Sequence, residues 1–150
     1  MRAEYDGTVL LAGAMSTGRA IRAALDLGAD LAYLGTRFLV ASEANVPAPQ
    51  QQMMLQATMA DIVYTPVFSG IPANYLAPSI AANGVDVDAL VRAGGVPGAE
   101  VTSTLFKPGQ ERPKAWKDVW SAGQGVGSLR AVQSTADIVA QLQREFAATR

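Results

Sequence analysis

The segment LLAGAMSTGRAIRAALDLGADLAYLGTRF, from Leu10 to Phe38, decides the fold. It reads as a buried strand over residues 8–12, a glycine turn, an amphipathic helix that ends at Gly28, and a second strand over residues 31–34. A second glycine turn follows at Gly35-Thr36. Because the connecting segment is long enough for a right-handed crossover, the two strands are predicted to run parallel. The segment therefore predicts two consecutive βα units.

The two glycine turns predict a phosphate site. Backbone N–H groups near Gly13 and Gly35 can converge on one phosphate because glycine permits close approach, and the N-terminus of the adjacent helix also favours an anion. The loops after strands 7 and 8 of a (β/α)8 barrel commonly hold such a phosphate. A single turn of this kind is more often only a tight turn. The pair, with the Thr36 hydroxyl in the second turn, favours a phosphate but does not indicate a reaction type.

Composition excludes several kinds of site. The chain has 150 residues, a net charge of -1, and neither cysteine nor histidine. Disulfides, cysteine nucleophiles, zinc sites with thiolate or histidine ligands and Ser-His-Asp catalysis are therefore excluded, and we expect no metal site. The balanced charge predicts neither a nucleic-acid partner nor a membrane surface. No apolar run approaches the roughly 20 residues that span a bilayer, and the N-terminus lacks a signal-peptide pattern, so a cytoplasmic location is expected.

The rest of the chain is predicted to be mostly helical. Residues 62–68 are β-prone, although Pro66 keeps them out of a central sheet position, and residues 69–72 read as a turn. Residues 94–112 read as an irregular loop. Predicted helices occupy residues 50–60, 78–82, 86–93 and 114–121, with Trp116 and Trp120 in the core, and a final helix begins at Ser134 with Ile138, Val139, Leu142 and Phe146 on its buried face.

Two further groups of residues are candidate ligand contacts. Gly123-Gln124-Gly125-Val126-Gly127 superficially matches a dinucleotide fingerprint, but a predicted helix and not a strand precedes it. Two readings stay open: a flexible end to that helix, or a glycine-rich backbone that approaches a ligand with Gln124 as an amide donor. Arg19 and Arg37 lie beside the two glycine turns, within reach of a phosphate, although Arg37 is expected to pair with a carboxylate. No residue is predicted to be catalytic.

Three stretches of sequence carry a family resemblance. They are GAMSTGRAIRAALDLGADLAYLGTRF, DIVYTPVFSGIPANYL from Asp61 to Leu76, and AWKDVWSAGQGVGSL from Ala115 to Leu129. In this order they resemble the seventh and eighth βα units, the post-barrel segment and the C-terminal AGQ motif of the nitronate monooxygenase family, formerly called 2-nitropropane dioxygenases. The resemblance covers nearly the whole chain. The glycine turns are shared with other FMN barrels, whereas the SG-P and AGQG segments are much more specific.

The resemblance implies an α/β fold, namely the C-terminal portion of a (β/α)8 TIM barrel with a helical tail. Residues 1–46 would be the last two βα units with their phosphate-binding turns. Residues 47–150 would be a mostly helical post-barrel extension within the same structural unit. The implied function is that of an FMN-dependent oxidoreductase that oxidises alkyl nitronates with dioxygen. FMN and a small-molecule substrate are the implied partners.

The resemblance also places the cofactor. The FMN phosphate would meet Gly13-Ala14 and Gly35-Thr36, and Gln124 would lie near the flavin. Many members of the family have a second glycine where this chain has Ala14. That departure is small, because an alanine keeps the backbone N–H.

A larger departure is the absence of the family's N-terminal strands, which carry the isoalloxazine contacts and a catalytic histidine. Because the chain has no histidine, we expect it to be inactive alone. Its two strands should leave an open edge, covered by the tail, by another copy of the chain or by the missing barrel portion. Two alternatives stay open: a non-catalytic fragment that binds phosphate, FMN or another chain, and a relative of FMN-dependent enoyl-acyl-carrier-protein reductases.

Overall fold

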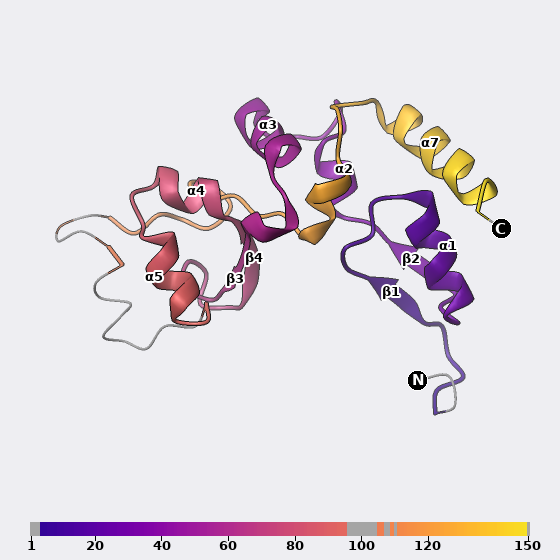
Figure 1. Ribbon diagram of the computed structural model, residues 1–150, viewed down its shortest axis with the longest axis horizontal. Coiled ribbons are helices and arrows are strands. Elements are labelled where there is room, and N and C mark those ends of the chain that lie inside the picture. Colours follow the sequence, from indigo (N-terminus) through magenta and orange to yellow (C-terminus); the bar gives the residue numbers. More distant parts are fainter. Residues whose placement is uncertain (1–3, 96–104, 107–108, 110, 150) are drawn as a thin grey trace.

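The computed structural model describes residues 4–95, 105–106, 109 and 111–149. The architecture is mixed α/β, with one parallel strand pair and one antiparallel strand pair in separate sheets. Figure 1 shows the parallel pair near the two chain ends and the antiparallel pair in the other half of the molecule. No helix in these ranges has the length and hydropathy of a membrane span.

The predicted βα segment is confirmed. Strands β1 (Leu10–Ala12) and β2 (Leu31–Tyr33) pair in parallel, and helix α1 (Gly18–Asp26) connects them. The helix begins after Thr17, whose hydroxyl accepts a 3.2 Å hydrogen bond from the Ala20 N–H. A cap of this kind stabilises a helix by about 1 kcal/mol. It fixes where α1 begins, just after the first glycine turn.

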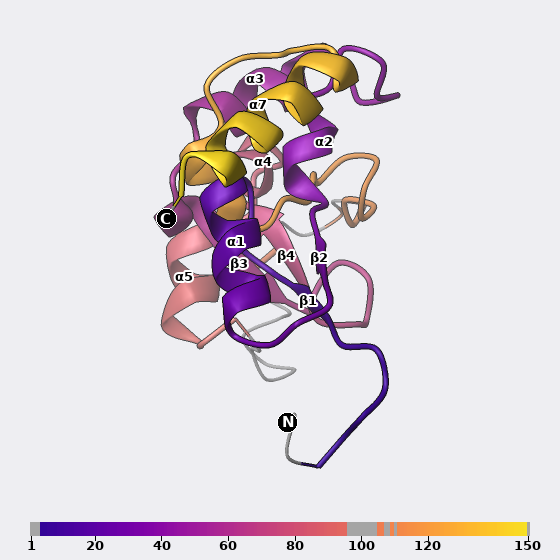
Figure 2. The same cartoon turned by 90° about the vertical axis from the view of Figure 1, so that its right-hand side faces the viewer.

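The C-terminal helix α7 (Thr135–Ala147) packs against α1, which brings segments more than a hundred residues apart side by side (Figures 1 and 2). Ser134 caps it, as predicted. Ile138 and Leu142 are buried, also as predicted. The predicted burial of Val139 is wrong, because this residue is 41% exposed. Successive helical residues point about 100° apart, so the residue after Ile138 turns away from α1.

Four short helices occupy the middle of the molecule. They are α2 (Thr36–Leu39), α3 (Ala48–Gln56), η1 (Met59–Asp61) and η2 (Gln124–Ser128). The predicted helix over residues 50–60 thus ends earlier, because Thr58 and Asp61 form a capping box that starts η1. The core between these helices contains Val40, Met54, Ala57, Leu76, Ala122, Val126 and Leu129.

A hairpin forms the second sheet. Strand β3 (Ile62–Thr65) ends at Pro66 and pairs antiparallel with β4 (Ala73–Leu76), which the sequence analysis did not predict. The predicted turn at residues 69–72 joins them. Helices α4 (Ala77–Ala82) and α5 (Val87–Arg92) follow close to their predicted positions and lie beside the hairpin (Figure 1).

The predicted helix over residues 114–121 does not form. Trp116 has a left-handed φ of +63°, which a right-handed helix does not contain, and it is 64% exposed rather than in the core. The Asp118 carboxylate accepts the Lys114 N–H at 2.9 Å, and the Trp116 N–H donates to the Val119 carbonyl at 2.8 Å. The segment therefore closes as a turn. Most of the predicted loop over residues 94–112 lies outside the described residues.

No strand from the described part of the tail pairs with β1 or β2, which corrects the expectation that the tail covers their open edge. In the described part of the chain, β1 and β2 pair only with each other, and the hairpin strands form their own sheet. Leu10 and Leu31 are 52% and 53% exposed, and Tyr33 is 61% exposed. Among the described residues the two strands therefore have no further strand partner, and Leu10, Leu31 and Tyr33 are each more than half exposed.

Candidate functional site

The five residues that the sequence analysis assigned to the cofactor line a single pocket. Gly13 and Ala14 follow β1, Gly35 and Thr36 follow β2, and Gln124 begins η2. The pocket has a volume of about 190 Å³. Its other lining residues are Ala12, Met15, Tyr33, Asn74, Gly123 and Gly125. The fold thus brings the two turns and the tail motif together, as the family resemblance implied.

The first turn is left-handed over two residues. Gly13 has a φ of +106° and Ala14 a φ of +54°. A non-glycine residue in the left-handed region costs roughly 1–2 kcal/mol, which gives a physical reason for a second glycine at this position in related proteins. Ala14 keeps its N–H, so the alanine changes the stability of the turn and leaves its donor in place.

The second turn has ordinary backbone angles and open space around it. Gly35 has a φ of -99° and is the N-cap of α2 without a side-chain cap. A Cβ atom added to Gly35 would meet no atom within 4 Å. The Thr36 hydroxyl oxygen accepts a 2.9 Å hydrogen bond from the Gly123 N–H, which leaves its proton available for a ligand. This hydroxyl was predicted to lie at the site, whereas its bond to the tail was not predicted.

The glycine-rich tail segment packs directly on both turns. Its reading as a flexible end to a preceding helix is wrong, because no such helix forms and residues 124–128 are themselves the 3-10 helix η2. A Cβ on Gly123 would lie 3.2 Å from the Thr36 hydroxyl, and a Cβ on Gly125 would overlap the Ser16 hydroxyl. A side chain at Gly123 or Gly125 would therefore crowd the Thr36 or the Ser16 hydroxyl. Gln124 is exposed between them, at the pocket surface.

The N-terminus of α1 is already occupied by a carboxylate. The Gly18 N–H donates a 2.7 Å hydrogen bond to Glu145 of α7. The sequence analysis expected this helix end to favour a ligand anion, and Glu145 takes that position instead. A negative side chain here stabilises the helix dipole, typically by about 0.3–1 kcal/mol. The N-terminus of α1 therefore does not offer its Gly18 N–H to a ligand.

Arg37 is buried and does not face the pocket. Its guanidinium donates to the amide oxygens of Gln133 at 2.6 Å and Gln141 at 3.1 Å, and it is only 4% exposed. Burial lowers the pKa of Arg37, while the charge of Glu145 acts in the opposite direction. The predicted pairing of Arg37 with a carboxylate is therefore wrong for the described residues: its direct partners are glutamine amides, and Glu145 acts on it only through its charge. Arg19 also lies near this carboxylate.

Glu145 joins the two βα units to the last helix. Burial acts to raise the pKa of Glu145, but hydrogen bonds from Gln141 and the Gly18 N–H, together with the charges of Arg37 and Arg19, outweigh it and hold the pKa below its ordinary value. Because the folded chain binds this proton more weakly than the unfolded chain, the resulting stability is full above the ordinary value of 4.5 and is lost as the pH falls through the lowered folded value.

A pH titration of stability should reveal this carboxylate. The Glu145→Gln variant keeps an acceptor for the Gly18 N–H but has nothing to titrate. From about pH 6 down to about pH 3 we expect the wild-type chain to lose more unfolding free energy than the variant. Urea denaturation at a series of pH values measures the difference. Parallel curves for the two proteins would contradict the assigned role of the Glu145 charge.

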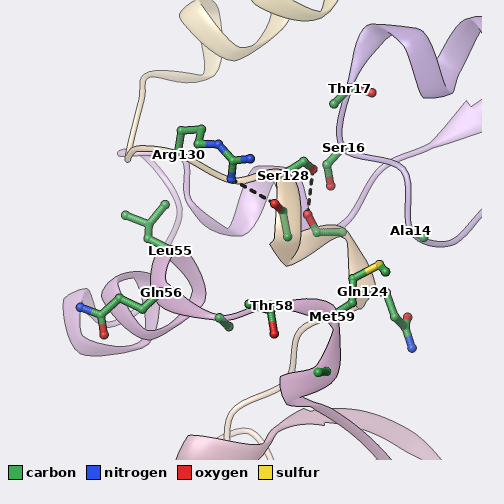
Figure 3. A pocket seen from close by; sticks show the side chains of 14 residues that line it. Ala14, Ser16, Thr17, Leu55, Gln56, Thr58, Met59, Gln124, Ser128 and Arg130 are labelled. Carbon is green, nitrogen blue, oxygen red and sulfur yellow. Dashed lines mark hydrogen bonds between the residues drawn. The ribbon is translucent and has the colours of Figure 1, made fainter.

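A larger pocket of about 800 Å³ adjoins the first (Figure 3). Ala14 and Gln124 line both, so the two form one continuous surface. The larger pocket lies between the first glycine turn, the segment from α3 to η1, and η2. Arg130 donates to the carbonyls of Gly127 and Leu129, at 3.0 and 2.7 Å, so its guanidinium holds the end of η2.

Sequence reasoning missed Asn74 as a site residue. It comes from β4, and it lines the smaller pocket beside Gly35 and Thr36. Its Oδ1 atom is buried and has no hydrogen-bond partner among the described residues. The stretch from Asp61 to Leu76 that carries part of the family resemblance contains Asn74, so that specific motif is the signal that could have found it.

Comparisons with known proteins give similar sequences and similar structures. The nitronate monooxygenase of Paraburkholderia phytofirmans is 29% identical over 138 residues, which are 92% of this chain and 37% of that protein. A FabK variant from Thermotoga maritima superposes with a TM-score of 0.68 at 26% identity, over 98% of this chain and 43% of the other. A nitroalkane oxidase from Streptomyces ansochromogenes gives a TM-score of 0.67 at 28% identity, over 97% of this chain and 41% of the other.

The chain therefore spans well under half the length of these relatives while nearly all of it matches them. The model of one family, described as nitronate monooxygenase, matches residues 6–145. That range includes both glycine turns, the hairpin and the glycine-rich tail segment. With a match over this much of its length, the chain belongs to the nitronate monooxygenase family.

Proposed function

We propose that this chain holds the phosphate of FMN between its two glycine turns, as part of an oxidoreductase of the nitronate monooxygenase type. The observation that carries the proposal is the convergence of Gly13, Ala14, Gly35, Thr36 and Gln124 on one pocket. Family membership and the likeness to a nitroalkane oxidase support flavin-dependent oxidation of a small molecule.

The pocket fits a phosphate group. Gly35 leaves open space where any side chain would project. The left-handed Gly13 and Ala14 turn the chain sharply at the end of β1, and backbone N–H groups in such turns form anion-binding concavities. None of the described residues that line the pocket is acidic, so no carboxylate competes with a bound anion. The Thr36 hydroxyl adds one side-chain donor.

Bound FMN would take electrons from an alkyl nitronate and pass them to dioxygen. The residues of this chain would bind and orient it. The two turns would donate backbone hydrogen bonds to the phosphate, and Gln124 would offer its amide to the flavin. The bond between Thr36 and Gly123 would keep the second turn and the tail at a fixed separation. A histidine base and the remaining flavin contacts would come from outside these 150 residues.

The same proposal covers the organisation of the chain. Residues 1–46 would supply the last two βα units of a (β/α)8 barrel, and residues 47–150 its post-barrel extension. The packing of α7 on α1 supports treating both parts as one structural unit. A cytoplasmic location stays a prediction from the sequence.

The variant Gly35→Val tests the site. Its φ of -99° suits a β-branched residue, so the substitution introduces no left-handed strain, unlike a change at Gly13. The valine side chain would occupy the space beside the second turn and prevent close approach of the phosphate. We expect the dissociation constant for FMN to rise at least about tenfold, or about 1.4 kcal/mol. Quenching of flavin fluorescence on titration with the chain measures it.

The control is Ala23→Val, which introduces the same side chain. Ala23 is exposed on α1 and lines neither pocket. This variant should bind FMN as the wild-type chain does. Equal FMN affinity in the wild-type chain and both variants would exclude the two-turn site.

A further inference from the structure

Helix α7 packs against α1 and also bonds to α2 (Figure 2). Glu145 accepts a 2.7 Å hydrogen bond from the Gly18 N–H, just after the first glycine turn. Gln141 accepts a 3.1 Å hydrogen bond from the guanidinium of Arg37, which directly follows the second turn. Gln141 also donates from its side-chain nitrogen to Glu145 at 2.7 Å. These bonds form a continuous connection from α1 to α2, which we call the α7 bridge.

The direction of the bonds requires a carboxylate at Glu145. The Gly18 N–H donates to one carboxylate oxygen, and the Gln141 side-chain nitrogen donates to the other. A glutamine in place of Glu145 has one acceptor oxygen and one donor nitrogen, so one of these two bonds would be lost. If the Gln141 amide turned over to accept instead, its nitrogen would face Arg37, which has only donors. An amide at this position therefore interrupts the α7 bridge.

Both ends of the α7 bridge lie in closely packed parts of the molecule. Arg37 is only 4% exposed, and Gln133 accepts a second hydrogen bond from it at 2.6 Å. A Cβ added to Gly18 would overlap the backbone of α7, so this helix lies directly on Gly18. Met15 and Ser16, which connect the first turn to Gly18, are buried. A change in the bridge would therefore move the segments that carry both turns.

We propose that Glu145 and Gln141 are positioning residues that set the separation of the two glycine turns and, through it, the affinity of the pocket for the phosphate of FMN. The inference rests on the proposed function, because it names the groups that hold the same site in place. Neither residue lines the pocket. A phosphate that accepts bonds from both turns requires their spacing to be held closely, which is the task of supporting residues behind a site.

A charge effect without the bridge predicts a different result. Burial acts to raise the pKa of Glu145, but hydrogen bonds and arginine charges outweigh it, so the carboxylate is ionised near neutral pH. A negative charge near a phosphate opposes binding, so its removal would tighten FMN binding if Glu145 acted through its charge alone. Loss of the α7 bridge would weaken binding instead. The sign of the change in Glu145→Gln therefore separates the two explanations.

The first test variant is Gln141→Met, which interrupts the α7 bridge and changes no charge. We expect its dissociation constant for FMN to rise about fivefold, as is typical of coupling between groups in one network. The matched control is Gln143→Met, because Gln143 is exposed on the same helix. This variant should bind FMN as the wild-type chain does. Quenching of flavin fluorescence measures the affinity, and circular dichroism confirms that each variant is folded.

The second test variant is Glu145→Gln, which should also weaken FMN binding about fivefold. A chain that carries both Gln141→Met and Glu145→Gln should bind no more weakly than either single variant, because both substitutions interrupt one connection. Wild-type affinity in Gln141→Met, tighter binding in Glu145→Gln, or losses that multiply in the double variant would overturn the proposal.

Spectra of the chain without FMN keep this inference separate from the proposed function. In 1H–15N NMR spectra, Glu145→Gln and Gln141→Met should each shift the amide signals of Gly35 and Thr36, whereas Gln143→Met should not. Changes confined to α1 and α7 would overturn the positioning role even if FMN binds. Shifts at the second turn, without FMN binding by the wild-type chain, would support the α7 bridge and contradict the proposed function.

Discussion

The 150-residue chain, supplied with FMN, dioxygen and a simple alkyl nitronate, should consume no oxygen above the rate of the same mixture without protein. The chain has no histidine, and a positioned general base typically contributes about 10²–10⁴-fold to a rate. Two parallel strands would contact at most part of a bound flavin, so the geometry that aligns substrate and cofactor would be lost as well. An oxygen electrode measures the rate directly.

The full-length Paraburkholderia phytofirmans nitronate monooxygenase is the positive control in the same assay. Robust FMN-dependent turnover by the chain alone would contradict the prediction and would require another base, for which Asp6 and Asp61 are the candidates. Asp61 is poorly suited, because hydrogen bonds from the backbone N–H and the hydroxyl of Thr58 lower its pKa. A carboxylate held in its ionised form accepts a proton weakly.

The variant Gly18→Val should destabilise the chain by about 3 kcal/mol. Gly18 begins α1 at the point where α7 crosses it, and a Cβ there would overlap the backbone atoms Leu142 O and Phe146 N. Backbone atoms in the middle of a helix cannot move aside as a flexible side chain can. The two helices would have to separate, which would also break the bond between the Gly18 N–H and Glu145. Urea denaturation followed by circular dichroism measures the loss.

Ala23→Val is the matched control, because Ala23 is exposed on the same helix. It introduces the same β-branched side chain and should cost only the difference in helix propensity, a few tenths of a kcal/mol up to about 0.7. A similar loss of unfolding free energy in both variants would contradict the close packing of α7 on Gly18.

The elements that are set by residues close together in the sequence were predicted correctly. The apolar run before Gly13, the apolar stripe of the helix and the glycine at its end were enough to place β1, α1 and β2. The same holds for α7, because Ser134 is a cap that acts within one turn. The parallel pairing followed from the length of the connection.

Predictions failed where a distant partner decides the structure, and in one place where a side-chain hydrogen bond competes with a helix. Strand β4, with the sequence ANYL, has few β-formers and exists because β3 pairs with it. The helix over residues 114–121 failed because the Asp118 side chain closes a turn with Lys114, a local hydrogen bond that competes with helix formation. The partners of Arg37 and Gly18 lie 96 and 127 residues away, and no spacing rule connects them.

The candidate site contains residues that the local sequence pattern predicts and residues that it does not. The positions of Gly13 and Gly35 in turns could be predicted from the sequence pattern, because each glycine follows an apolar strand. That Gln124 meets them required the family resemblance, since no periodicity links residue 124 to residue 13. Asn74 entered the pocket only through the unpredicted pairing of β4.

Titration of the isotopically labelled chain with FMN, followed by 1H–15N NMR spectra, tests the central claim most directly. The amide signals of Gly13, Ala14, Gly35 and Thr36 should shift together with one dissociation constant, because their N–H groups would contact the same phosphate. The Gly18 amide, already bonded to Glu145, should shift least among the glycines near the site. Shifts confined to Gly18 and α1, or no saturable shift at the two turns, would contradict the account.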